Sequence, residues 1–191
     1  RENRKTLAAW CPGRSVLNLF AYTGGFSLQA ARAGATRIVS VDRASEALAR
    51  AQDNVVLNGQ DPSVHEFVAE DALRYLERIA AERVKFDVVI SDPPSFARSK
   101  GQRHGALRAY ERLHALAFGV LVQGGVYAAA SCTSQVDVES FRGTIAQGAV
   151  KAQRRVQIVH DAGQALDHPV LIGHPEGRYL KFVVVRCLGA S

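Results

Sequence analysis

The sequence predicts one α/β domain built on a doubly wound, mostly parallel sheet of seven strands with helices on both faces. Short runs rich in Val and Ile alternate with stretches of helical apolar spacing, which is typical of parallel strands joined by crossover helices. Only the loop Asp161–Arg178, in which no apolar-periodic helix fits, separates the last two runs, so they predict an antiparallel C-terminal hairpin. At 191 residues with 47% hydrophobic content, the chain can bury one core but not two ordinary ones.

The individual elements follow from this alternation along the chain. The expected strands are Val16–Phe20, Arg37–Asp42, Val64–Val68, Phe86–Ser91, Val126–Ser131, Val156–His160 and Tyr179–Cys187. The expected helices are Phe26–Ala33, Ser45–Asn58, Asp71–Arg83, Leu107–Val122 and Val138–Gln153. Gly59 and Gly124 stand where helices commonly stop. Ligands of open α/β sheets bind beyond the carboxyl ends of the strands, so we expect the site among the residues that follow each strand.

Composition and charge limit the class of protein. The 24 Lys and Arg residues against 18 Asp and Glu give a net charge of +6, which suits a polyanionic partner without requiring one. No run of about 18 apolar residues predicts a membrane span, and no signal peptide is recognisable, so we expect a cytoplasmic protein. Three cysteines without a CxxC spacing favour neither a disulfide framework nor a metal site. Because the chain begins at Arg1 and contains no Met, we expect it to be a fragment with an upstream part.

The first two strands lead to a predicted cofactor pocket. Paired glycines in the segment Ala21–Ser27 allow a sharp turn and a close approach of the backbone to a ligand. The segment is not a GxGxxG motif, and a plain strand-to-helix turn is the alternative interpretation. The second strand ends in Asp42, where Rossmann-type sheets bind ribose hydroxyls. These features indicate a cofactor that contains a nucleoside.

The third and fourth strands are followed by further acidic residues. Asp71 either accepts a hydrogen bond from an adenine amino group or favours the start of the next helix, and the two interpretations are equally good. In the segment Ser91–Phe96, two prolines fix the φ angles and remove two donors, which presents Asp92; capping of a turn is the alternative for this residue. Asp-Pro-Pro at this place is characteristic of methyltransferases that act on nucleobases. It disfavours nicotinamide enzymes, which share only the glycine turn and the ribose acid.

Six segments of the chain resemble one family. They are Arg1–Arg4, Asn18–Ser27, Ser40–Asp42, Asp92–Phe96, Ser131–Ser134 and Asp167–Pro169. In these segments the chain resembles the bacterial large-subunit (23S) ribosomal RNA cytosine-C5 methyltransferases, which carry an N-terminal PUA domain. The resemblance covers essentially the whole chain and implies a Rossmann-like class I methyltransferase catalytic domain, S-adenosyl-L-methionine as cofactor and 23S rRNA as substrate. It also implies a PUA domain ahead of Arg1, in agreement with the expected upstream part.

The resemblance also implies how the cofactor binds. Its methionine part would lie near Phe20, Tyr22 and Gly24, its ribose on Asp42 and its adenine beside Asp71. The full set of candidate cofactor-binding residues is Phe20, Tyr22, Thr23, Gly24, Asp42, Arg43, Asp71, Ala72 and Asp92.

Cys132 is the catalytic nucleophile that the resemblance implies. C5 of cytosine is a poor nucleophile until a thiolate adds to C6, and a base must afterwards remove the C5 proton. Cys132 follows a predicted strand, so we expect it at the same sheet edge as Asp92, the candidate that binds the cytosine and assists proton removal. A small buried hydrophobe is the alternative for Cys132 and the expected state of Cys11 and Cys187. Many related enzymes carry a second cysteine in the fourth-strand motif, and Pro-Pro-Ser stands here instead, so product release is unassigned.

Residues after the fourth strand predict contacts with RNA. The loop Phe96–Gly105 offers basic side chains to phosphates and an aromatic ring to a base, although a solvated flexible loop is an equally good interpretation. The candidate substrate-binding residues are Pro93, Pro94, Phe96, Arg98, Lys100 and Arg103. The cluster Lys151, Arg154 and Arg155 is interpreted as an ordinary helix C-terminus, and His168 and His174 as candidate pocket-lining residues without a metal.

Other functions stay open beside the cytosine-C5 reaction. One is methylation of a purine in RNA, such as guanine, for which mutation of Cys132 would leave activity intact. Another is a non-catalytic module that binds S-adenosylmethionine or RNA without methyl transfer. A nicotinamide dehydrogenase is more distant, and tight binding of NADH would indicate it. The oligomeric state is open, with a homodimer as one alternative, and we expect this chain alone to bind the cofactor well and RNA weakly.

Overall fold

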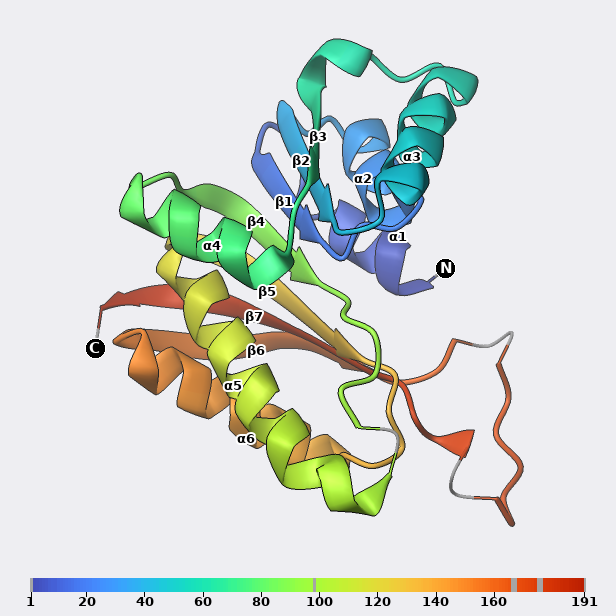
Figure 1. Cartoon of the computed structure of the whole chain (residues 1–191), viewed down its shortest axis with the longest axis vertical. Coiled ribbons are helices and arrows are strands. Elements are labelled where there is room, and N and C mark those ends of the chain that lie inside the picture. The colour runs from blue at the N-terminus through green and yellow to red at the C-terminus, as the bar shows by residue number, and fades with distance from the viewer. Residues whose placement is uncertain (1, 98, 166–167, 175–176, 191) are drawn as a thin grey trace.

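A computed structural model describes the chain except for residues 1, 98, 166–167, 175–176 and 191 (Figure 1). Its strands form one sheet in the order β3-β2-β1-β4-β5-β7-β6. Their bounds are β1 Ser15–Leu19, β2 Arg37–Asp42, β3 His65–Ala69, β4 Phe86–Ser91, β5 Leu121–Ser131, β6 Arg154–Ala162 and β7 Lys181–Ala190. Neighbouring strands from β3 to β5 are parallel, whereas β7 is antiparallel to both β5 and β6. The predicted fold class is confirmed, including the antiparallel C-terminal hairpin.

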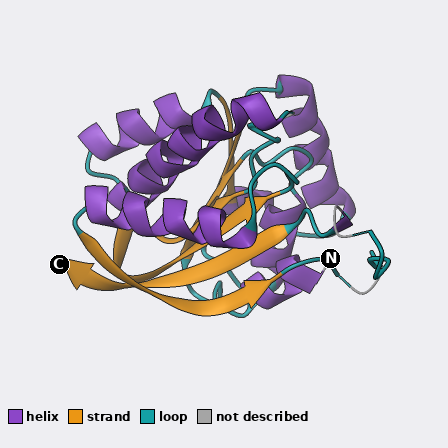
Figure 2. Ribbon diagram, turned by 90° about the horizontal axis from the view of Figure 1, so that it is seen from below, coloured by secondary structure: helices purple, strands orange, loops and turns teal. Residues whose placement is uncertain are grey.

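Helices cover both faces of this sheet (Figure 2). One face carries α1 Glu2–Ala8, α2 Gly25–Arg32 and α3 Ser45–Leu57; the other carries α4 Ala72–Ala81, α5 Arg103–Gly119 and α6 Val138–Lys151. Two short 3-10 turns, η1 Pro62–Val64 and η2 Lys100–Gln102, complete the elements. The alternation from Val88 to Ile90 of β4 explains the two layers, because Val88 and Ile90 pack toward α1 and α2 while Val89 packs toward α4 and α5. Burial on both faces is why the central strands are almost entirely apolar.

Three details of the prediction were wrong. The helix expected at Leu107–Val122 begins earlier, at Arg103, and ends at Gly119, because β5 already starts at Leu121. Gly124 ends no helix: it lies within β5 with φ of 77°, where the pairing with β4 shifts its register. The next residue, Gly125, has no room for a Cβ, which would lie 2.9 Å from the Asp87 carbonyl oxygen. The glycine pair therefore forms a bulge inside a strand that is longer than predicted.

The ends of the chain's elements also differ from expectation. Helix α1 was not predicted, and Leu7 is the only buried residue among the described side chains of its seven residues. Lys151 does close α6 as expected, but Arg154 and Arg155 belong to β6. Gly59 follows α3 in a left-handed conformation, with φ of 62°, as predicted for a helix stop. Among the described residues, no helix combines the length and the apolar character that a membrane span requires.

Candidate active site

The carboxyl ends of the parallel strands gather the candidate residues at one edge of the sheet. Phe20 follows β1, Asp42 ends β2, Asp92 follows β4 and Cys132 follows β5. A cleft of about 510 Å³ opens at this edge and is lined by Phe20, Tyr22, Asp42, Arg43, Ala44, Asp71, Ala72, Leu73, Asp92, Pro94 and Phe96. Seven of the nine candidate cofactor residues thus line one cavity, whose size is typical of a small-molecule site.

The two remaining candidates, Thr23 and Gly24, form the turn beside this cleft. Phe20, Tyr22 and Gly24 all have positive φ values, of 59°, 49° and 80°. Such conformations are rare for residues with a side chain, so the turn from β1 to α2 stores strain at the edge of the cleft. A Cβ on Gly24 would also lie 3.0 Å from the Cβ of Ala51, which explains why this position holds a glycine. Asn54 of α3 fixes the turn further by donating a hydrogen bond to the Thr23 carbonyl oxygen, at 3.1 Å.

Asp42 is held in place by the backbone around it. Its Oδ2 accepts a hydrogen bond from the Tyr22 amide at 2.8 Å, and its Oδ1 accepts one from the Ala44 amide at 2.9 Å. A carboxylate has about four acceptor sites, so both oxygens can still accept a hydroxyl proton. The fixed carboxylate, facing a cavity with apolar walls, fits the ribose of an adenosine-containing cofactor.

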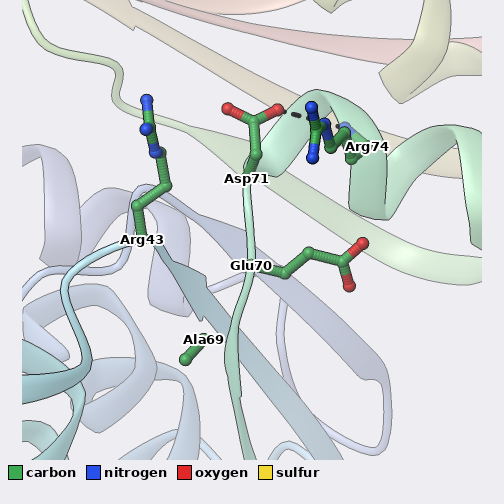
Figure 3. Close-up of a pocket in the computed structure, with 5 residues that line it drawn as sticks. All are labelled: Arg43, Ala69, Glu70, Asp71 and Arg74. Carbon is green, nitrogen blue, oxygen red and sulfur yellow. Dashed lines mark hydrogen bonds between the residues drawn. The ribbon is translucent and has the colours of Figure 1, made fainter.

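Asp71 adopts one of the two roles that its sequence position suggested. It is the N-cap of α4, since its Oδ1 accepts hydrogen bonds from the amides of Leu73 and Arg74 at 3.0 and 3.1 Å. It also lines a second cavity, of about 520 Å³, in which it lies between Arg43 and Arg74 (Figure 3). Because Arg43 and Asp71 line both cavities, this second cavity adjoins the cofactor cleft. A role of Asp71 toward adenine is compatible with its capping role but is not required by it.

A separate pocket of about 430 Å³ surrounds Cys132, and we call it the Cys132 pocket. Its lining residues are Asn3, Asp92, Pro93, Pro94, Cys132, Gln164, Ala165, His168, Tyr179 and Leu180. Asp92 and Pro94 also line the cofactor cleft, so the two cavities meet at the Asp-Pro-Pro segment. The Cys132 side chain is exposed, whereas Cys11 and Cys187 are buried as expected. The fold therefore places a reachable thiol on one side of Asp92 and the cofactor cleft on the other.

Buried hydrogen bonds support the two strand ends that carry Asp92 and Cys132. Ser91 and Tyr127 share a hydrogen bond of 2.7 Å between their hydroxyls, and the Tyr127 hydroxyl lies 2.7 Å from His114 Nδ1. Tyr110 of α5 donates a hydrogen bond of 3.0 Å to Ser131, the residue before Cys132. Burial lowers the pKa of His114 to about 3, so its imidazole is neutral in this network. Through these hydrogen bonds, α5 supports the ends of β4 and β5.

The surroundings of Asp92 change its acidity. Desolvation by the protein atoms around it raises the pKa of its carboxyl, although the residue is exposed where the two cavities meet, and the Arg4 guanidinium partly opposes this shift. Arg4 comes from α1, lies 5.8 Å from the centre of the Phe26 ring and fills the space above Gly25. A carboxyl with a raised pKa can both hold and accept a proton closer to neutral pH. Neither Arg4 nor Asn3 was predicted as a site residue, although both lie in one of the segments on which the family resemblance rests.

The candidate substrate residues are divided between several environments. Pro93 and Pro94 line the Cys132 pocket, but Phe96 lines the cofactor cleft and packs its ring 4.8 Å from that of Tyr110. Arg103 donates hydrogen bonds to Asp137 and Ser140, at 2.8 and 2.7 Å, and so ties α5 to the start of α6. Arg98 lies outside the described residues, as does the side chain of Lys100. Of the candidate substrate residues whose side chains the structure describes, Pro93 and Pro94 thus line the pocket, and the basic one, Arg103, is paired with Asp137 instead.

The loop between β6 and β7 closes the outer side of the Cys132 pocket. Gln164, Ala165, His168 and Leu180 line this pocket and also an adjoining groove of about 550 Å³. His168 therefore lies at the pocket, as the sequence suggested, whereas His174 is not among the residues that line it. In the part of the chain that the structure describes, no three His, Cys, Asp or Glu side chains gather in a way that would hold a metal ion.

Comparisons with known proteins agree with this geometry. A family profile described as S-adenosylmethionine-dependent methyltransferase matches residues 1–154. The "Ribosomal RNA large subunit methyltransferase I" of Aeromonas hydrophila is 42% identical over 186 residues, which are 97% of this chain and 47% of that protein. The chain spans about half the length of the curated relatives it matches.

Two solved structures are similar over 97% of this chain and 48% of their own. One is a Streptococcus mutans protein, provisionally assigned as an S-adenosylmethionine-dependent methyltransferase, with 26% identity and a TM-score of 0.87. The other is provisionally assigned as a methyltransferase and was solved with SAH bound; it has 27% identity and a TM-score of 0.86.

Proposed function

Since this chain belongs to the S-adenosylmethionine-dependent methyltransferase family, we propose that it methylates C5 of a cytosine in large-subunit ribosomal RNA. One observation carries the choice of reaction: an exposed thiol, Cys132, shares a pocket with Asp92 next to the cofactor cleft. A nucleophile at this position is needed for chemistry at C5 of cytosine and is not needed for methylation of a purine nitrogen. The name of the relatives, "Ribosomal RNA large subunit methyltransferase I", supports ribosomal RNA as the substrate.

The residues of the cofactor cleft are assigned by their chemistry. S-adenosylmethionine, when bound, supplies an electrophilic methyl group on a sulfonium. Asp42 would accept hydrogen bonds from its ribose hydroxyls, the turn from Phe20 to Gly24 would hold its methionine part, and Asp71 would lie at its adenine. Asp92 and Pro94 would stand where the cofactor cleft and the Cys132 pocket meet.

We assign Cys132 and Asp92 different roles in the reaction at the cytosine ring. The Cys132 thiolate would form a bond to C6 of the cytosine, and the displaced electron pair would make C5 a nucleophile. C5 would then take the methyl group from S-adenosylmethionine, with the S–CH3 bond breaking and S-adenosylhomocysteine leaving. A base then removes the proton from C5, and the returning electron pair expels the thiolate and restores the aromatic ring. Asp92 is our candidate for orienting the cytosine through its N3 and exocyclic amino group, and for assisting the proton removal.

The Cys132 pocket also bears on how the target base of the RNA would reach the thiol. The Cys132 pocket, of about 430 Å³, is large enough to take a base, so we propose that a base in folded RNA is flipped out to enter it, at a cost of a few kcal/mol. We propose that a PUA domain in the whole protein supplies much of the RNA affinity that offsets this cost. The length of the relatives, about twice that of this chain, leaves room for such a domain.

A methyl-transfer assay tests the proposed reaction. The full-length protein and its Cys132→Ala variant are incubated with labelled S-adenosylmethionine and undermodified large-subunit rRNA, and the nucleosides are analysed. We expect labelled 5-methylcytosine from the unchanged protein and none from Cys132→Ala. Cys187→Ala is the matched control, because this thiol is buried on β7 away from the pocket, and it should keep the activity. Label on a purine, or full activity of Cys132→Ala, would overturn the proposal.

A further inference from the structure

The first residue of β7, Lys181, is a buried lysine. Its side chain is only 2% exposed, although lysine is among the residues least often buried. Its Nζ donates hydrogen bonds to the carbonyl oxygens of Thr133, Val136 and Tyr179, at 2.8 Å for Val136 and 2.9 Å for Tyr179. These three acceptors match the three N–H donors of an ammonium group. The structure therefore satisfies a buried positive charge with carbonyl dipoles.

The position of Lys181 relates it directly to Cys132. In the register of β5 and β7, Lys181 lies opposite Ser131, the residue that precedes Cys132. Two of its acceptors, Thr133 and Val136, belong to the turn that leads from Cys132 to α6. The ammonium thus lies beneath the turn that presents the thiol and holds both ends of that turn.

In the described ranges of the chain, no carboxylate lies within ion-pairing distance of Lys181 Nζ. Burial lowers the pKa of Lys181 to about 8, while Cys132 and Asp137 act in the opposite direction and favour the charged form. The hydrogen bond from Nζ to the carbonyl oxygen of Thr133, the residue that follows Cys132, brings this charge next to the residue that carries the thiol.

Several other charged or titratable groups face the same turn and must be weighed. They are Asp92 after β4, Tyr110 and Arg103 of α5, Asp137 before α6, His168 and Tyr179 of the β6–β7 loop, and Arg4 of α1. The two carboxylates disfavour a nearby thiolate. Arg103 pairs with Asp137 at 2.8 Å, and Arg4 acts on Asp92, so both carboxylates are partly compensated by cations of their own. Lys181 is then a buried cation whose charge remains available to the thiol.

We propose that Lys181 is a positioning residue that holds the Cys132 turn in place and stabilises the Cys132 thiolate with its buried positive charge. The proposal deepens the proposed function, because it rests on Cys132 acting as a thiolate. Its test does not need RNA, because the reactivity of a thiol reports its thiolate fraction directly.

The experiment measures the rate at which iodoacetamide alkylates Cys132 as a function of pH, with the modified peptide quantified by mass spectrometry. Lys181→Met removes the charge at similar length, and Lys181→Gln keeps two N–H donors without the charge. For both variants we expect the midpoint of the pH profile to rise by about one unit and the rate at pH 7 to fall about tenfold. Arg186→Met, which removes a cation from an exposed position of the same strand, should leave the profile unchanged.

Two further measurements keep the result decisive. Thermal unfolding and S-adenosylmethionine binding identify which variants fold. If Lys181→Met does not fold, the pH profile of Lys181→Gln is used for the test. A folded Lys181→Gln with the midpoint of the unchanged protein would overturn the proposal, even if its turn is more readily cleaved by protease. A shifted midpoint together with full methyl transfer by Cys132→Ala would instead support the charge coupling and reject the proposed reaction.

Discussion

The cofactor cleft and the Cys132 pocket meet at Asp92 but are built in different ways. The cleft depends on the backbone: a turn with three positive φ values and a carboxylate held by two amides. The Cys132 pocket depends on side chains that converge from α1, β4, β5 and the β6–β7 loop, above a buried layer of aromatic residues and Lys181. The cleft takes its residues from the first half of the chain, between Phe20 and Phe96, whereas the Cys132 pocket combines residues from Asn3 to Leu180. The two sites should therefore respond separately to mutation.

The largest expected difference is in cofactor affinity. Asp42→Ala removes a charged acceptor of ribose hydroxyls and leaves the Tyr22 and Ala44 amides without their partner, which costs about 3 kcal/mol. We expect S-adenosylmethionine binding, measured by calorimetry, to weaken about 100-fold. Cys132→Ala should bind the cofactor as the unchanged protein does. Equal weakening by both substitutions would show that the two sites are not separable.

The close packing of α5 against α6 should make the stability of the protein sensitive to a larger side chain between these helices. A Cβ on Gly148 would lie 2.6 Å from His114 Cβ and 3.0 Å from the Ala115 amide nitrogen. We expect Gly148→Ala to lower the free energy of unfolding by about 3 kcal/mol in urea denaturation, because the helices must separate.

Gly143 is the matched control for this substitution, since it lies on the same helix and a Cβ there meets nothing within 4 Å. Gly143→Ala should stabilise the protein by about 0.5 to 1 kcal/mol, because alanine is the better helix former. A neutral effect of Gly148→Ala would contradict the close packing of the two helices.

The turn beside the cofactor cleft should be less costly to perturb. Gly24→Ala places a side chain at φ of 80° and brings it 3.0 Å from Ala51 Cβ, so we expect a loss of about 2 kcal/mol in unfolding free energy. Gly34→Ala shares the strain, with φ of 87°, but meets no atom within 4 Å, and about 1 kcal/mol is expected. The difference between the two variants measures the contact with Ala51. Only Gly24→Ala should also weaken cofactor binding.

The smallest effect concerns the start of α6. Hydrogen bonds from Ser140, together with Arg103, lower the pKa of Asp137 to about 2. Because the folded-state pKa lies below the ordinary value, the ionised carboxyl stabilises the fold at neutral pH. This contribution is lost as the pH falls from about 4 to about 2. In urea denaturation at pH 7, Asp137→Ala should cost about 1 kcal/mol, and its difference from the unchanged protein should be smaller at pH 2, where part of the carboxyl is still ionised.

The contrast between the two sites also explains what the sequence could predict. The alternation of strands and helices, the terminal hairpin and most of the cofactor cleft could be predicted from hydrophobic patterns and short motifs, such as the glycine turn and Asp42. The Gly124 bulge was mistaken for a helix stop because a glycine with positive φ serves in both places. Phe96 and Arg103 were interpreted as free to reach RNA, but packing against Tyr110 and pairing with Asp137 are tertiary contacts that no local pattern records.

The residues that support Cys132 were harder to predict for the same reason. Lys181 is the first residue of a strand whose sequence is mostly apolar, and only the pairing of β7 with β5 brings it next to the Cys132 turn. Asn3 and Arg4 are far from Asp92 in the chain, and α1 is too short to show a helical pattern. Tyr110 and Tyr127 read as ordinary core aromatics, because their hydroxyl partners, Ser131 and Ser91, lie on other elements.

The antiparallel direction of β7 determines which edge of the sheet the preceding loop reaches. An antiparallel strand starts at the edge where its parallel neighbours end, so the loop that precedes β7 faces the same edge as Asp92 and Cys132. A parallel strand in this place would have delivered that loop to the opposite edge. Described residues of the loop between β6 and β7 therefore line the Cys132 pocket, and none of them lines the cofactor cleft. Under the proposed function, a change in this loop would alter the pocket for the target base and leave the cofactor cleft as it is.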